Sequence, residues 1–165
     1  MSKIDPKPDE LSTVRPDAEM LTQQRLPYSC EISNPKPTEL IVVRPDRQAL
    51  TNQRSPNFVG LSARTAGTTG ISMELVVMPP GAIAKPHVHP AHETVLYLLK
   101  GRVEVRYGKG LEQCQVCEAG DFVFTPPGVP HQPRNLSSTE PVYIVTARND
   151  PDEQEKVVPY EPNLD

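Results

Sequence analysis

From residue 58 onward, the chain is a series of short apolar runs, each closed by a turn rich in glycine or proline. The runs are too short for long helices, and none carries a sustained helical period. Closely spaced runs of this kind are typical of an all-β sandwich or barrel. We therefore predict an all-β domain whose strands are Ser72–Met78, Thr94–Lys100, Val103–Tyr107, Gln113–Cys117, Phe122–Thr125 and Val142–Thr146.

The first third of the chain is richer in proline and repeats itself. Residues 6–27 align with residues 35–56 at a shift of 29 residues, and two copies are too few to stack into a solenoid. We interpret the repeat as a proline-rich N-terminal arm that has been duplicated. The predicted divisions are a first arm copy (1–33), a second copy docked on a barrel (34–57), and the β domain with a C-terminal tail (58–165).

The second arm copy is the better candidate for docking. Its residues 40–43 form a stronger strand candidate than residues 11–14 of the first copy. An arm exchanged between two subunits is the alternative to one docked and one loose copy. The helical candidates are residues 16–24 and 45–53, each of which begins with Pro-Asp.

Charge and cysteine content narrow the class of protein. The formal net charge of −4 argues against nucleic acid or an anionic membrane as a partner, because neither would meet a basic face. No apolar run suggests a signal peptide or a membrane span. Three cysteines suit a reducing cytoplasm. Cys114 and Cys117 have CxxC spacing, but we expect them on opposite faces of a strand and not as a redox pair. The predicted location is cytoplasmic.

Three of the four histidines fall within residues 87–93. On a strand, His87 and His89 would point from the same face, so that one ion inside a barrel could bind both. Glu93 could add an anionic oxygen, and imidazole with carboxylate suits a divalent first-row metal ion. The alternative is that these side chains are hydrogen-bonded turn and strand residues that bind no metal.

Two segments resemble the motifs of the cupin family. Residues 81–101 resemble the first motif, with a glycine, a His-x-His pair, a glutamate and a closing glycine. Residues 120–135 resemble the second motif at Gly120, Pro126, Gly128, His131 and Asn135. The resemblance implies a double-stranded β-helix, also called a jelly-roll or cupin barrel. It also implies one divalent transition metal ion (Fe, Mn, Ni or Zn) bound by His87, His89, Glu93 and His131.

The first motif departs from the family pattern in one respect. Seven residues separate Glu93 from Gly101, where the family has six, so that Thr94 occupies the usual ligand position. A β-bulge could restore Glu93 to the ion. Otherwise three histidines form the site, with His92 as a substitute ligand or a neighbour of the ligands. We favour Glu93 with a bulge, because some cupins carry His-Glu-Thr before the same apolar strand.

These expectations lead to a metal-dependent enzyme that performs a dioxygenase-type oxidation on a small oxygenated organic molecule. Glu93 and His92 are the candidate catalytic residues, since either could move a proton. The alternatives are a cupin that binds or senses a small ligand without turnover, and a metal-dependent sugar or keto isomerase. A cavity-facing His92 would favour an enzyme, and a solvent-facing one would favour a binding module. Cupins of this size usually pair through strand edges, so we also expect a homodimer.

Overall fold

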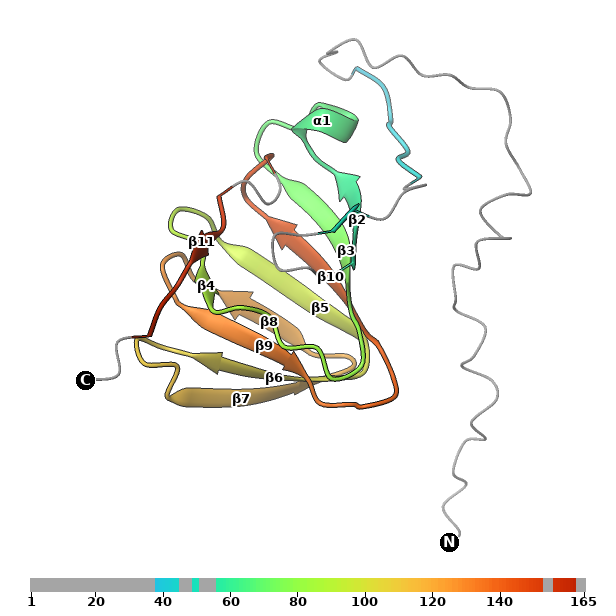
Figure 1. The fold of residues 1–165 in the computed structure, drawn as a ribbon. Helices are drawn as coiled ribbons and strands as arrows, with labels where there is room; N and C mark the ends of the chain where they lie inside the picture. The colour runs from blue at the N-terminus through green and yellow to red at the C-terminus, as the bar shows by residue number, and fades with distance from the viewer. Residues whose placement is uncertain (1–37, 45–48, 51–55, 153–155, 163–165) are drawn as a thin grey trace, which may run out of the picture. The chain divides into compact units, whose positions relative to one another are not determined.

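The computed structural model describes residues 38–44, 49–50, 56–152 and 156–162. Its strands form two antiparallel sheets that face each other (Figure 1). The first sheet has the order β1-β2-β3-β10-β5-β8, with β1 Ala49–Leu50, β2 Pro56–Leu61, β3 Ser72–Met78, β10 Val142–Arg148, β5 Thr94–Lys100 and β8 Phe122–Thr125. The second has the order β11-β4-β9-β6-β7, with β11 Val158–Pro159, β4 His87–Val88, β9 His131–Asn135, β6 Arg102–Tyr107 and β7 Gln113–Glu118.

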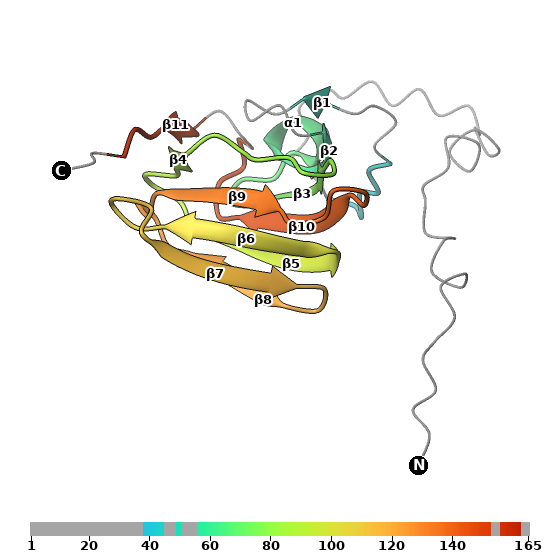
Figure 2. The same cartoon turned by 60° about the horizontal axis from the view of Figure 1, so that its bottom comes forward.

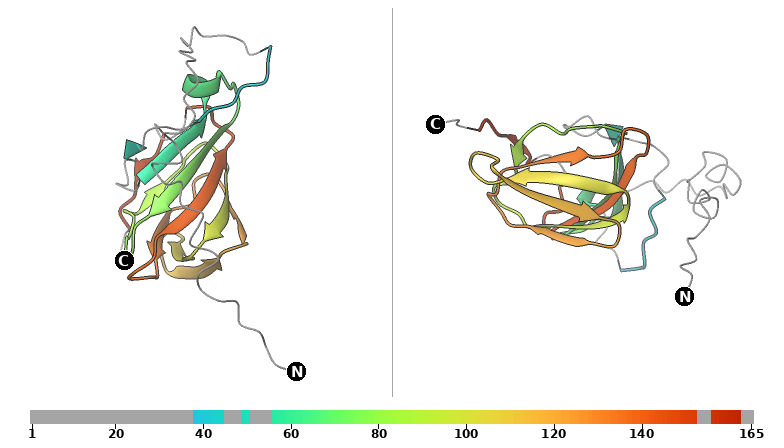
Figure 3. Two further views of the ribbon diagram at one scale, coloured as in Figure 1. Left: turned by 90° about the vertical axis from the view of Figure 1, so that its right-hand side faces the viewer. Right: turned by 90° about the horizontal axis from the view of Figure 1, so that it is seen from below.

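Strands that are far apart in sequence lie side by side in both sheets. β10 lies between β3 and β5, and β9 lies between β4 and β6. The chain therefore crosses repeatedly from one sheet to the other. Figure 2 shows the two layers, with β9, β6 and β7 over β10 and β5. Figure 3 shows β2, β3 and β10 side by side from another direction. This arrangement is a jelly roll, so the predicted all-β class is confirmed.

The interior between the sheets is apolar at one end and polar at the other. Along β10, Val142 and Ile144 are buried at the first end, while Thr146 and Arg148 are buried at the second. The neighbouring strand β3 shows the same change from apolar to polar side chains. Its Met78 pairs with Val142 at the apolar end, and its Ser72 pairs with Arg148 at the polar end. The apolar end contains the core cluster, whose members are Met78, Leu98, Val103, Cys117, Val142 and Ile144. The polar end is where a functional site can form.

Two residues of the resembling motifs have structural roles. Gly101, in the turn between β5 and β6, has a φ of 95°, and a Cβ there would lie 2.7 Å from Val142 Cγ2, so only glycine fits. Asn135 is 1% exposed. Its Nδ2 donates to the carbonyl oxygens of Met78 and Glu140, and its Oδ1 accepts from the Ser137 backbone N–H. Asn135 thus ties the end of β9 to β3 and to the following loop.

The predicted strands agree closely with the observed ones. Three have the predicted bounds, and β6, β7 and β10 are longer by one or two residues. Cys117 lies in the core and Cys114 is exposed, so the two side chains lie on opposite faces of β7, as predicted from the strand alternation. The one α-helix of the described residues, α1 (Ala63–Ala66), was not predicted. It is a single turn, with a capping box between Ser62 and Thr65.

The strand predicted at residues 40–43 is not observed. Residues 38–44 have no regular structure, and Leu40 is 88% exposed. Among the described residues no strand pairs with this run, and strand propensity alone does not hold an unpaired strand. Residues 6–27, including the helix predicted at 16–24, lie outside the described residues. Of the helix predicted at 45–53, only β1 (Ala49–Leu50) is described, and it pairs with β2 as a strand. The arm boundaries and its docking remain predictions.

The edge of the first sheet at β8 exposes two large side chains. Phe122 is 84% exposed and Phe124 is 56% exposed. A second subunit could pack on these exposed apolar side chains. The homodimer itself remains a prediction. Among the described residues, no helix has the length and apolar character needed to cross a membrane.

Candidate metal centre

Three histidines meet at the polar end of the interior. His87 lies in β4, His89 follows that strand, and His131 begins β9, where it pairs directly with His87 across the sheet. Their ligand atoms all lie within 4.8 Å of one another. The ring centroids of His87 and His131 are 4.3 Å apart. The cluster brings together residues 44 positions apart in the chain, as the resemblance implied.

Backbone carbonyls orient two of the three imidazoles. His87 Nδ1 lies 2.8 Å from the Lys85 carbonyl oxygen, and His131 Nδ1 lies 2.9 Å from the Val129 carbonyl oxygen. A carbonyl oxygen only accepts, so each Nδ1 carries the hydrogen and each Nε2 keeps a free lone pair. In both cases a proline, Pro86 or Pro130, separates the histidine from its acceptor and stiffens the approach. This bond to Nδ1 is the usual support of a metal-ligating histidine.

The environment keeps the imidazoles neutral. Burial, reinforced by the nearby His131, lowers the pKa of His87 to about 4. Burial, together with the charge of Arg148, lowers the pKa of His89 to about 2. Burial also lowers the pKa of His131. Neutral imidazole is the form that ligates metal ions, and buried His89 Nδ1 has no hydrogen-bond partner among the described residues. The three side chains therefore fit a transition metal ion.

The low histidine pKa values predict that metal-free protein loses stability in mild acid. Unfolded histidine has a pKa near 6.5, so below that pH the unfolded chain binds more protons than the folded one, and stability falls as pH falls. We expect the free energy of unfolding to drop by about 5 kcal/mol between about pH 7 and pH 4.5. Urea unfolding of chelator-treated protein would measure it. An equal drop in the His89→Gln variant would show that the low pKa of His89 does not contribute to the loss of stability.

The predicted ligand Glu93 does not join the cluster. It is exposed; its backbone N–H donates to Asn149 Oδ1, and Asn149 Nδ2 donates to its carboxylate. Thr94, which is 3% exposed, occupies the inward position instead. The β5–β10 pairing does contain a register shift, but it lies beyond Leu98. Residues on the near side of the shift keep their alternation, so Thr94 faces inward and Glu93 outward.

His92 is buried behind the cluster. It is 2% exposed, its ring centroid lies 4.8 Å from that of His89, and its Nδ1 lies 3.6 Å from Asp150 Oδ2. Asp150 in turn binds Lys156 Nζ at 2.6 Å. His92 is neither one of the three clustered histidines nor one of the residues that line the cavity. It faces neither the cavity nor solvent, so its position favours neither of the predicted roles.

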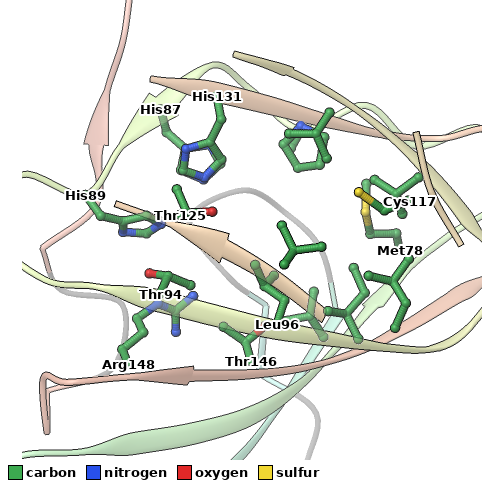
Figure 4. Close-up of a pocket in the computed structure, with 18 of the residues that line it drawn as sticks. Met78, His87, His89, Thr94, Leu96, Cys117, Thr125, His131, Thr146 and Arg148 are labelled. Atoms are coloured by element: carbon green, nitrogen blue, oxygen red, sulfur yellow. The ribbon is translucent and has the colours of Figure 1, made fainter. Parts of the chain in front are cut away.

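The histidines line one end of a cavity of about 120 Å³ inside the barrel (Figure 4). Its other polar lining residues are Thr94, Thr125, Thr146 and Arg148. Among the described residues that line it, there is no carboxylate and no lysine. Figure 4 shows Arg148 pointing toward the same end as Thr94 and His89.

Arg148 and Glu74 form a buried ion pair beside this cavity. They are 7% and 4% exposed, respectively, and the pair links β10 to β3. Neither residue was predicted from the sequence as part of the site. Glu74 could have been identified from the sequence, because it is an acidic residue at an inward position of an apolar strand. Arg148 lay just beyond the predicted end of its strand.

Comparison with known proteins gives consistent matches. A family model described as "Cupin domain" matches residues 74–147. A germin-like protein of Arabidopsis thaliana (subfamily 3 member 2) is 34% identical over 82 residues, which cover 48% of this chain and 34% of that protein. The chain spans little more than a third of the length of the germin-like relatives that it matches.

Solved structures show the same fold. A Klebsiella pneumoniae protein with a double-stranded β-helix domain aligns with a TM-score of 0.53 and 23% identity, over 67% of this chain and 88% of that one. An oxalate oxidase aligns with a TM-score of 0.54 and 27% identity, over 66% of this chain and 56% of that one. The predicted double-stranded β-helix is therefore confirmed.

Proposed function

The chain belongs to the cupin superfamily through the domain at residues 74–147, and on this basis we propose that it is a metal-dependent enzyme. In this proposal it binds one divalent transition metal ion and oxidises a small oxygenated organic molecule by a dioxygenase-type reaction. The observation that carries the proposal is the buried trio of His87, His89 and His131, whose ligand atoms lie within 4.8 Å of one another. Two of the three present Nε2 because Nδ1 is held by the backbone.

The three histidines would hold the ion and leave coordination positions open toward the cavity. A bound ion supplies Lewis acidity toward an enolate or catecholate oxygen and, where it is redox-active, reactivity toward O₂. The protein's own part is to hold the imidazoles neutral and rigid and to orient the substrate in the cavity. The apolar inner wall of the cavity would exclude water from the reacting centre.

The cavity lining favours oxidation over isomerisation. An isomerase must move a proton between two carbon atoms and needs a positioned base for it. The described lining residues offer no carboxylate or lysine for that role, and the three histidines would be occupied as ligands. Relatedness to an oxalate oxidase also supports an oxidation. The same lack of a base leaves a binding or sensing module as the second candidate.

Metal content and oxygen uptake together test the proposal. The untagged full chain would be analysed by plasma mass spectrometry, then reloaded separately with Fe(II), Mn(II), Ni(II) or Zn(II). We expect about one ion per chain, and oxygen consumption with an enolisable or catecholic compound for a redox-active ion but not for zinc. Free metal ions without protein provide the background rate.

Two results would contradict the proposal in different ways. Stoichiometric metal with no oxygen uptake across the compound panel would favour the binding module. Absence of metal after reconstitution would remove the metal site itself. The Glu93→Gln variant is the matched control, because this exposed side chain lies outside the cluster, and both readouts should match those of the unmodified chain.

A further inference from the structure

In the proposed centre, the protein groups around the divalent ion would not compensate its positive charge. Three neutral imidazoles bring no negative charge to a divalent ion, and the described residues that line the cavity include no carboxylate. Arg148 and Glu74 neutralise each other, so they leave the ion's charge unchanged. Within an interior of low dielectric, an uncompensated charge is unfavourable and attracts a ligand of opposite sign. A site of this composition would favour an anionic ligand.

Arg148 offers that ligand a second contact. The guanidinium is buried, and its Nη1 is taken by Glu74. Its Nε has no hydrogen-bond partner among the described residues. A carboxylate oxygen of a ligand could accept a hydrogen bond from this Nε–H. The buried Thr94 hydroxyl is likewise without a partner in the described part of the chain.

The position of Arg148 links this Nε–H to the histidines. Arg148, His87 and His89 all line the same cavity. Figure 4 shows its guanidinium group beside Thr94 and below His89.

The rest of the cavity suits an apolar body. Beyond the histidines, the wall is made of side chains such as Leu96, Leu98, Val103 and Ile144. The volume of about 120 Å³ approaches the roughly 150 Å³ of an apolar cavity that holds benzene. A compact dianion without hydrocarbon would leave this wall uncovered.

We infer that the cavity binds a small monocarboxylate with an apolar body, such as an aromatic ring or a short branched chain. The carboxylate would lie between the metal centre and Arg148, and the hydrocarbon would lie against the inner wall. This inference rests on the proposed function, because it names the ligand class of the same site. It assigns Arg148 as the residue that recognises the carboxylate and Glu74 as the residue that positions Arg148.

Binding of three simple probes tests the inference without any turnover. Calorimetry would compare benzoate, benzamide and acetate on the full chain loaded with redox-inactive Zn(II) and on chelator-treated chain. Benzamide keeps the shape of benzoate without its charge, and acetate keeps the charge without the ring. We expect benzoate to bind at least tenfold more tightly than either on the zinc-loaded chain, and to keep a smaller preference over benzamide on the metal-free chain. Equal affinities for benzoate and benzamide in both forms would overturn the inference.

A paired substitution tests the role of Arg148. In the Glu74→Gln/Arg148→Gln variant, two amides replace the ion pair without leaving a single buried charge. We expect its preference for benzoate over benzamide to fall at least fivefold, while Glu93→Gln leaves that preference unchanged. An undiminished preference in a folded double variant would refute the assignment of Arg148. Metal content is measured on the same samples, so a chain that binds benzoate selectively but no metal would contradict the proposed function and not the ligand class.

Discussion

The His131→Ala variant is expected to lose its affinity for a transition metal ion by a factor of about a hundred or more. Loss of a partner behind a ligand alone costs 10- to 100-fold, and this substitution removes a ligand itself. His131 is one of the three donors that the described residues bring to the cluster, and its Nδ1 bond to Val129 holds its Nε2 in position for an ion. Competition of protein with a fluorescent chelator for Zn(II) would measure the dissociation constant.

Glu93→Ala provides the matched control for this result. Its carboxylate is exposed and hydrogen-bonded to Asn149, so its removal should change the metal affinity less than twofold. Circular dichroism of each variant would show that the sheets remain folded. Retained affinity in His131→Ala, or a large loss in Glu93→Ala, would show that the ligand set is not the three-histidine cluster.

The Glu74→Leu variant is expected to lose about 3 to 5 kcal/mol of folding stability, because it leaves the Arg148 guanidinium buried without a counter-charge. Glu74 and Arg148 are 4% and 7% exposed, so bulk water solvates the unpaired guanidinium poorly. A loss of this size is a large fraction of the roughly 5 to 15 kcal/mol that stabilises a typical domain. Chemical denaturation with urea would measure the change.

The double variant Glu74→Leu/Arg148→Met separates the cost of an unpaired charge from the loss of packing. A buried ion pair can be replaced by apolar side chains at little cost, and sometimes with a gain of about 1 to 4 kcal/mol. We expect the double variant to recover most of the stability lost by Glu74→Leu. If the double variant is no more stable than Glu74→Leu, the unpaired charge of Arg148 does not explain the effect of the single change.

Much of the fold was predictable from local features of the sequence. The turns of glycine and proline delimit the apolar runs, so Ser72–Met78, Thr94–Lys100 and Phe122–Thr125 were predicted with their observed bounds. The prediction at residues 40–43 failed because a strand also needs a neighbour, and propensity carries no information about neighbours. The helix α1 is a single capped turn, too short to produce a periodic signal.

Some residues of the site were likewise predictable from local sequence, and others depend on the tertiary structure. His87, His89 and His131 could be identified from the sequence, because motif spacing and the preceding prolines are local properties of the chain. Whether Glu93 or Thr94 faces them was decided only by the tertiary structure. Adjacent strand residues point to opposite sides, so the pairing of β5 with β10 and the place of its register shift determine which of the two turns inward. The pair of Arg148 with Glu74 also exists only because β10 and β3 lie side by side, although 74 residues separate the two side chains in the chain.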